Sequence, residues 1–236
     1  MNVTDMMFTA GDGGPGDGID YSKLVIHLKF DNTSPYVIFD SVSNPPKSWI
    51  SESAPQRPQN AIVGYGSLNL INNSESGAYV YSTDVDVMNA MSFGNMNDYM
   101  IRFKYKADNW NAYYGAVLGS GPGNPVVTFF DNGKRMAVTG QSFYLNGGNA
   151  MSLNVVHEFL VTRKDHKIYF FSDGVLLNAG GSDDYADWPT QTEWRIGGQS
   201  HADEDFSGLL DDIQVFNGFG GPTASYTVDI TTPFYP

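Results

Sequence analysis

Two short aromatic segments carry the residue types that bind sugars. They are residues 109–114 (NWNAYY) and residues 183–188 (DDYADW). Sugar rings stack on exposed aromatic faces, while neighbouring amides and carboxylates bind the hydroxyl groups. We therefore predict a carbohydrate site that contains Trp110, Tyr113, Tyr114, Tyr185 and Trp188. The alternative is that Trp110 and Trp188 pack into the ends of the fold.

The sequence lacks the common catalytic motifs. His157-Glu158 is not followed by the second histidine of an HExxH site, because position 161 is Val. There is no GxSxG motif, and the glycines near the N-terminus do not lead into a Gly-Lys-Ser/Thr phosphate loop. With four histidines and no cysteine, the chain offers few ligands for a transition metal. We predict that the protein is not an enzyme.

The charge of the chain restricts its partners. Its formal net charge is −13, from 26 acidic and 13 basic residues. Such a surface repels phosphate backbones, so we predict no nucleic-acid partner. It favours divalent cations, above all calcium, which takes six to eight oxygen ligands. Zero cysteines exclude disulfides, so packing must provide the stability.

The N-terminal sequence shows no export signal, since residues 1–8 lack a basic region and a long apolar run. No stretch approaches the ~18–20 apolar residues that cross a bilayer. We therefore expect a protein made in the host cytoplasm that does not insert into a membrane. A virion protein would fit, because phage proteins leave the cell by lysis, and we expect it on the exterior of the particle.

The chain divides into three parts. Residues 1–22 are polar and Gly-rich and form a flexible arm, residues 23–218 form one β-sandwich, and residues 219–236 form a tail. Strands are predicted for residues 23–30, 36–42, 67–71, 78–82, 98–106, 116–119, 126–130, 136–139, 158–163, 167–172, 175–177 and 213–216. The strand at 36–42 is expected to pair with the first strand, and the strands at 67–71 and 78–82 are expected to frame a turn at 72–77. Residues 43–60, with four prolines, are expected to be loop. The composition, with 26 Gly and 14% aromatics, agrees with an all-β fold.

Two segments near the C-terminus identify a family. Residues 156–178 (VHEFLVTRKDHKIYFFSDGVLLN) read as strand, turn, strand, Asp-Gly turn and strand. Residues 206–217 (FSGLLDDIQVFN) place two aspartates before an alternating strand. Together they resemble the closing third of the laminin G-like, concanavalin A-like lectin/glucanase superfamily. The resemblance implies an antiparallel two-sheet jelly-roll sandwich.

The resemblance also implies a metal site and bears on catalysis. Members often hold a structural calcium ion near the closing aspartates and the first strand, which corresponds here to Asp211 or Asp212 with Asp31. The alternative is that the aspartates bind turn amides; the acidic groups at 183–187 and 203–205 are weaker candidates. Glucanases of this fold carry alternating carboxylates (ExDxE) on one strand. That pattern is absent here.

Two functions from different classes remain at this stage. The first is a non-catalytic virion structural protein, such as a capsid decoration or tail-attached domain, that also binds surface glycans. The second is a dedicated carbohydrate-binding adhesin or receptor-binding module, and a glycan hydrolase or lyase is third. In either main case we expect residues 1–22 and 219–236 to contact other virion proteins or further copies of the chain, and the host polysaccharide to be a partner.

Overall fold

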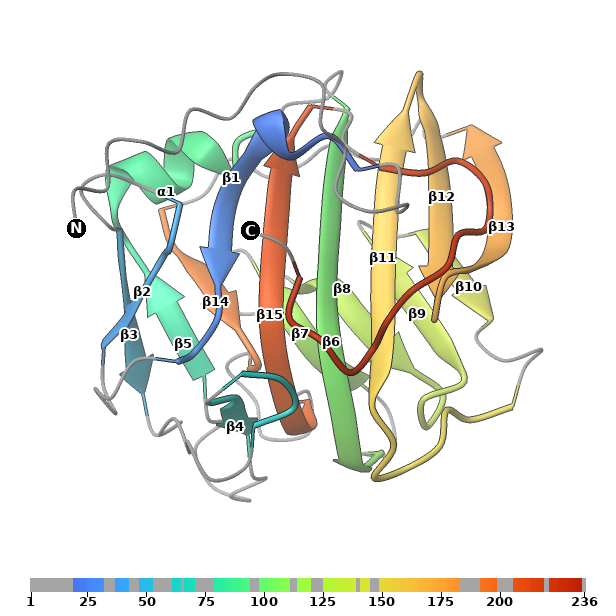
Figure 1. Ribbon diagram of the computed structural model, residues 1–236, viewed down its shortest axis with the longest axis horizontal. Helices are drawn as coiled ribbons and strands as arrows, with labels where there is room; N and C mark the ends of the chain where they lie inside the picture. Colours follow the sequence, from blue (N-terminus) through green and yellow to red (C-terminus); the bar gives the residue numbers. More distant parts are fainter. Residues whose placement is uncertain are drawn as a thin grey trace.

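Two antiparallel sheets stack face to face in the computed structural model (Figure 1). The structure describes residues 19–31, 37–42, 47–52, 61–64, 66–70, 79–93, 98–110, 114–119, 125–138, 141–144, 149–182, 192–198, 206–218 and 221–234. Over these residues the chain is the predicted all-β, jelly-roll-type sandwich.

Sheet A has the strand order β1-β15-β6-β11-β12-β13, and β4 pairs with β15 beyond the end of β1. Its strands are β1 (Leu24–Leu28), β4 (Leu68–Leu70), β6 (Tyr99–Asn109), β11 (His157–Lys164), β12 (Lys167–Ser172), β13 (Val175–Ser182) and β15 (Ser207–Asn217). The closing strand β15 therefore lies beside the first strand, in the middle of the sheet rather than at its edge.

Sheet B has the order β10-β9-β8-β7-β14-β5-β3-β2 and lies behind sheet A in Figure 1. Its strands are β2 (Val37–Phe39), β3 (Ser48–Glu52), β5 (Tyr79–Ser82), β7 (Tyr114–Gly119), β8 (Pro125–Phe130), β9 (Arg135–Val138), β10 (Gln141–Tyr144) and β14 (Trp194–Ile196). The described helical elements are short: α1 (Val85–Ala90), capped by Asp84, and the 3-10 turn η2 (Tyr21–Lys23).

The alternating strands produce the core as predicted. Successive side chains of a strand point to opposite faces, so Ile101 and Phe103 of β6 lie between the sheets and Arg102 and Lys104 point outward. The residues predicted to be buried are all buried, namely Leu24, Ile26, Leu28, Ile101, Phe103, Leu160, Ile168, Phe170, Ile213 and Val215. Leu24 and Leu160, however, belong to a second apolar cluster on the outer face of sheet A.

The β11-β12-β13 segment confirms the predicted hairpins. Asp165 and His166 have φ values of 49° and 60°, and Asp173 and Gly174 have 49° and 75°. Positive φ at both central residues is the type I′ pattern, whose twist matches the flanking strands. Gly174 has a second role, because a Cβ there would lie 2.3 Å from the Tyr226 carbonyl oxygen. The turn is thus where the C-terminal tail approaches the sheet.

Three strand predictions were wrong in pairing or extent. Residues 36–42 were expected to pair with the first strand, but β2 pairs with β3 in sheet B. The region 43–60 was expected to be loop, but it contains β3, whose Trp49 is buried. Because short strands between prolines give little alternation, the pattern did not reveal it. The strands β4 and β5 were expected to frame one turn, but they belong to different sheets.

The C-terminal tail, residues 221–234, crosses the outer face of sheet A from β13 toward β15 (Figure 1). With η2 it covers the second apolar cluster, which consists of Ile19, Leu24, Met100, Leu160, Phe171 and Phe216. We expected the tail to find its contacts on a neighbouring molecule, whereas the described tail lies on its own chain. Of the predicted arm, residues 1–22, the structure describes only residues 19–22, where Ile19 is buried and η2 begins at Tyr21. The predicted contacts of the arm and the tail with other molecules stay predictions.

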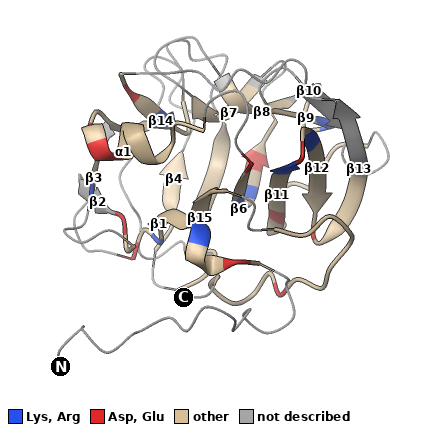
Figure 2. Cartoon of the chain, turned by 90° about the horizontal axis from the view of Figure 1, so that it is seen from above, with Lys and Arg blue, Asp and Glu red and all other residues tan. Residues whose placement is uncertain are grey.

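Basic and acidic residues occur along many of the described elements (Figure 2). No helix among the described residues is long and apolar enough to span a membrane.

Candidate functional site

Trp110, the first residue of the predicted sugar site, packs against the core at the end of β6. Its Nε1 donates to the Met151 carbonyl at 2.9 Å, and its ring centroid lies 4.8 Å from that of Phe129. One face of the indole covers Gly133, where a Cβ would lie 2.2 Å from Cε2. This is the packing expected of the alternative role.

The other predicted sugar residues lie outside the described part of the chain. Tyr113, Tyr185 and Trp188 are not described, and Tyr114 begins β7 without a described side chain. The predicted aromatic site therefore stays a prediction.

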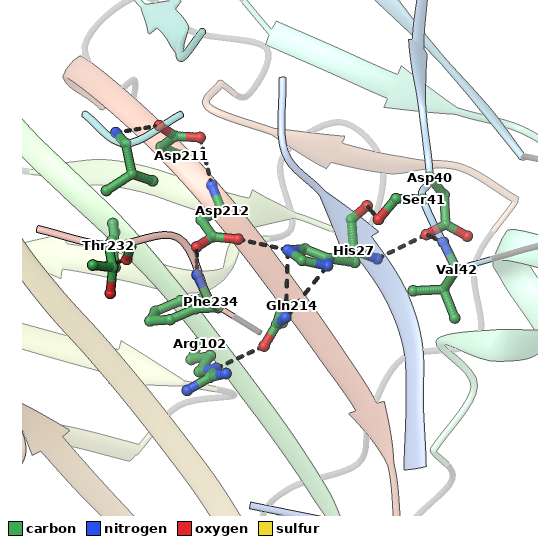
Figure 3. Close-up of polar contacts among 12 residues, drawn as sticks. His27, Asp40, Ser41, Val42, Arg102, Asp211, Asp212, Gln214, Thr232 and Phe234 are labelled. Carbon is green, nitrogen blue, oxygen red and sulfur yellow. Dashed lines mark hydrogen bonds and ion pairs between the residues drawn. The ribbon is translucent and has the colours of Figure 1, made fainter. Parts of the chain in front are cut away.

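The two adjacent aspartates of β15 point to different places, as Figure 3 shows. Asp211 Oδ2 accepts from the Val63 amide at 3.0 Å and from Ser67 Oγ at 3.1 Å. Burial raises the pKa of Asp211 to about 8. Asp31 also contacts this segment, because its Oδ1 accepts from the Gly66 amide at 3.1 Å. The structure thus brings Asp31 and Asp211 to one loop, residues 61–67.

Asp212 sits in a β-bulge. The pairing of β15 with β6 shifts between Asp211 and Gln214, and Asp212 has φ 52°. Bulges re-aim side chains, and here the carboxylate turns toward β1 and the tail. Its Oδ1 lies 2.5 Å from His27 Nε2, and its Oδ2 accepts from the Phe234 amide.

Both carboxylates are therefore engaged by protein donors, which a calcium ion would have to replace. Among the described residues no group of three or more acidic, His or Cys side chains is arranged to hold a metal. A calcium site at Asp211 or Asp212 with Asp31 stays a prediction, as do the alternatives at 183–187 and 203–205, which lie outside the described residues.

A polar row continues from Asp212 across the outer face of sheet A (Figure 3). Gln214 Nε2 lies 3.3 Å from both ring nitrogens of His27, and its Oε1 accepts from Arg102 Nε at 2.7 Å. Arg102 also donates to Tyr21 Oη at 2.6 Å and lies 3.8 Å below the Phe234 ring. Burial lowers the pKa of His27, although the Asp212 hydrogen bond and charge oppose the shift.

The row ends at Lys104 and Glu158. Lys104 Nζ donates to the carbonyls of Asp229, at 3.1 Å, and Thr232. Glu158 Oε1 accepts from Tyr226 Oη at 2.6 Å, while its Oε2 is buried and has no hydrogen-bond partner among the described residues. Burial lowers the pKa of Lys104 and raises that of Glu158 to about 7. These groups hold the tail in place and are closed to a large ligand while it is docked.

The outer face of sheet B carries a different group of side chains at β3, β5 and β14. Tyr81 pairs across the sheet with Ile50 on one side and Arg195 on the other. The Tyr79 and Tyr81 rings lie 5.9 Å apart, and the Arg195 guanidinium lies 4.3 Å over the Tyr79 ring. Arg195 is paired with Glu193, and Ile50 is 42% exposed. We call these five residues the sheet B platform.

Sequence reasoning missed the sheet B platform. Residues 78–82 were interpreted only as a strand, although Tyr79-Val80-Tyr81 places two tyrosines on the face opposite the buried Val80. That spacing was the available signal. The sequence around Arg195 and Ile50 gave no such signal, because only the pairing of strands in the sheet brings these residues beside Tyr81.

The fold has known counterparts among solved structures. Domain 4 of AbnA, a GH43 extracellular arabinanase from Geobacillus stearothermophilus, in complex with arabinotriose, aligns with TM-score 0.60 and 13% identity over 85% of this chain and 95% of that one. The binding domain of Botulinum neurotoxin DC, in complex with rat synaptotagmin II, aligns with TM-score 0.59 and 12% identity over 84% of this chain and 49% of that one.

Trypanosoma rangeli sialidase aligns with TM-score 0.56 and 13% identity, and this chain corresponds to 31% of its length. At such identities the likeness shows the fold alone. No curated protein sequence matches the chain.

The sequence itself matches a family over residues 74–219, which is more than half of the 236 residues. The matched range includes every strand from β5 through β15 and so most of both sheets. The chain therefore belongs to the Concanavalin A-like lectin/glucanases superfamily.

Proposed function

We propose that the protein is a non-catalytic glycan-binding module and that the sheet B platform is its binding surface. The observation that supports this most directly is the Tyr79–Tyr81 pair beside the Arg195–Glu193 ion pair on the outer face of a sheet. Aromatic faces bind sugar C–H groups, and a guanidinium with a carboxylate binds hydroxyls as donor and acceptor.

The charges of the platform favour neutral sugars. Arg195 is neutralised by Glu193, and the whole chain has a net charge of −13. An anionic glycan would be repelled without a compensating local cation. A structurally similar domain was solved with arabinotriose, a neutral sugar, which agrees with this proposal.

The proposal of no catalysis rests on the carboxyl groups. A glycosidase needs one carboxyl group with a raised pKa and a second nearby, both facing the substrate. The described carboxyl groups with raised pKa, Glu158 and Asp211, lie beneath the tail and beneath the loop 61–67. Neither position admits a polysaccharide.

A binding assay tests the platform. We expect the wild-type chain to be retarded in affinity gels that contain a neutral polysaccharide such as arabinan, and Tyr81→Ala to bind about tenfold more weakly. Val85→Ala is a control, since Val85 is 68% exposed and lies on α1. Equal retardation of wild type and Tyr81→Ala would refute the platform, and preference for a sialylated glycan would refute the neutral-sugar assignment.

The virion setting is a separate proposal. In it the module decorates a capsid or tail and binds host polysaccharide from the exterior of the particle. Mass spectrometry of purified particles tests it: particles that lack this chain would contradict the setting without affecting the glycan site.

A further inference from the structure

The C-terminal tail is bound by sheet A as a ligand would be. Four strands and one turn contribute partners: Asp212 of β15, Arg102 and Lys104 of β6, Glu158 of β11, the amide of Leu176 in β13, and the carbonyl of Gly174 in the β12–β13 turn. The tail contributes no strand to either sheet. Its recognition therefore depends on side chains that project from a sheet face, as in a peptide-binding site.

Most tail atoms used for recognition belong to the backbone. Lys104 binds the carbonyls of Asp229 and Thr232, Asp212 accepts from the Phe234 amide, and the Tyr226 amide donates to the Gly174 carbonyl at 2.9 Å. Two rings add specificity: Phe234 covers the Arg102 guanidinium, and Tyr226 packs edge-on against Phe171 at 5.5 Å. None of these contacts depends on which chain supplies the segment.

The connection between β15 and the tail is suited to a change of direction. It reads Gly218-Phe219-Gly220-Gly221-Pro222, and Gly218 has φ 110°, which few other residues adopt. A glycine-rich hinge of this kind allows a terminal segment to dock on its own chain or on a neighbour.

Docking of the tail has unfavourable as well as favourable contributions to its free energy. It buries Lys104, which is 0% exposed, and Glu158, whose Oε2 gains no partner among the described residues. Desolvation of charged groups offsets much of what their new contacts contribute. Many tail residues, including Thr227 and Asp229, stay exposed. A segment held in this way opens more readily than the core strands.

We propose that the outer face of sheet A is a docking site for the C-terminal segment 221–234 and that it also takes this segment from a second copy of the chain. Reciprocal exchange gives a two-fold dimer in which each sheet A holds the partner's tail. Within one chain the tether keeps the tail at high effective concentration, so the exchanged dimer forms at high protein concentration.

Cysteine cross-linking of the full chain tests the exchange, because the natural sequence contains no cysteine. One chain carries Thr227→Cys in the tail, and a second, affinity-tagged chain carries Val175→Cys. The side chain of Val175 is 57% exposed and adjoins the turn that binds Tyr226. The two are mixed at high concentration and treated with a short bismaleimide. We expect a tagged heterodimer whose yield rises with concentration.

A chain with both cysteines serves as the reference for docking. We expect it to cross-link internally and run as a monomer at low concentration. Val85→Cys replaces Val175→Cys in the control mixture, because Val85 is 68% exposed, slightly more than Val175, and lies on α1 outside the tail contacts. No heterodimer above this control, with the internal cross-link intact, would overturn the exchange. Failure of the internal cross-link would overturn the docking site itself.

A variant of the tail tests whether the exchange depends on the tail contacts seen in the structure. Phe234→Ala in the chain with Thr227→Cys removes the ring over Arg102, and we expect about tenfold less heterodimer at equal concentration. An undiminished yield would mean that the cross-link reports nonspecific association, and would overturn the proposal. The outcome is independent of the glycan site, which lies on the other sheet.

Discussion

The side chains of Arg102 and Lys104 show how a residue's environment departs from its sequence pattern. Both alternate with apolar residues along β6 and so point away from the core. Yet they are 2% and 0% exposed, because the tail and η2 cover them. Each meets hydrogen-bond acceptors there and a ring over its charge. These partners are what makes the burial of two cations tolerable.

Trp110 is expected to contribute to stability. Replacement by Ala removes the packing on Phe129 and Gly133 and leaves the Met151 carbonyl without its donor. We expect Trp110→Ala to lower the free energy of unfolding by about 3 kcal/mol, measured by urea denaturation. Leu153→Ala, at a position 44% exposed, should change it by less than about 0.5 kcal/mol. A Trp110→Ala variant with unchanged stability and lost glycan binding would instead place Trp110 in the sugar site.

At the scale of elements, β15 organises sheet A. Its first half pairs with β4 and its second half with β1, and β6 runs along its other side. The bulge at Asp212 falls between the two halves. It lets Asp211 face the loop 61–67 while Asp212 faces β1 and the tail. One strand therefore holds both the loop and the tail.

Tail docking is expected to weaken as the pH rises. Burial raises the pKa of Glu158 to about 7, against opposing contributions from Tyr226 and from the charges of Arg102 and Lys104, while Asp173 adds to the shift. The docked form thus binds a proton that the open form releases. The contribution of Glu158 to docking is complete below about pH 4.5 and is lost as the pH passes about 7. Hydrogen exchange at the Tyr226 and Leu176 amides should accelerate across this range.

Glu158→Gln is the matched variant for this prediction. Gln is neutral at every pH and still accepts from Tyr226, so the exchange of the same amides should vary less between pH 5 and pH 8 beyond the intrinsic effect of pH. An equal pH dependence in both proteins would show that another group controls the tail.

At the scale of the whole molecule, the sandwich has two unlike outer faces. Sheet A is covered by the chain's own tail, while sheet B carries the platform of Tyr79 and Tyr81 at β5. A self-docked or exchanged tail therefore leaves the platform accessible. Glycan binding and dimer formation can therefore operate together. A dimer would carry two platforms, which would increase its avidity for a glycan with several binding sites.

Calcium binding is also a whole-molecule prediction. If Asp31 and either Asp211 or Asp212 hold the ion, calcium should raise the melting temperature and excess chelator should lower it, since a ligand of the native state stabilises it. A net charge of −13 attracts cations without a site, so magnesium and the variant Asp31→Asn are the controls. An unchanged melt in chelator, or equal effects of both metals, would count against the site.

The local strand patterns were readable without a structure where the alternation was long. The strands β6, β11 and β12, the Asp-Gly turn before β13 and the buried residues Ile101 and Phe170 all follow from a period of two and from turn chemistry. The short strand β3 did not, because five residues between prolines carry too little pattern, and the strand predicted at 36–42 was placed beside the wrong partner.

The sequence by itself determined the all-β sandwich, its family and the face that each long strand turns to the core, since these depend on neighbours along the chain. Only the tertiary structure decided which strands pair, what covers the outer faces and where the polar groups meet. Asp212 and His27 are 185 residues apart in sequence, and Lys104 meets the tail carbonyls only after the chain has closed. Such contacts arise from packing between distant segments, and no local periodicity encodes them.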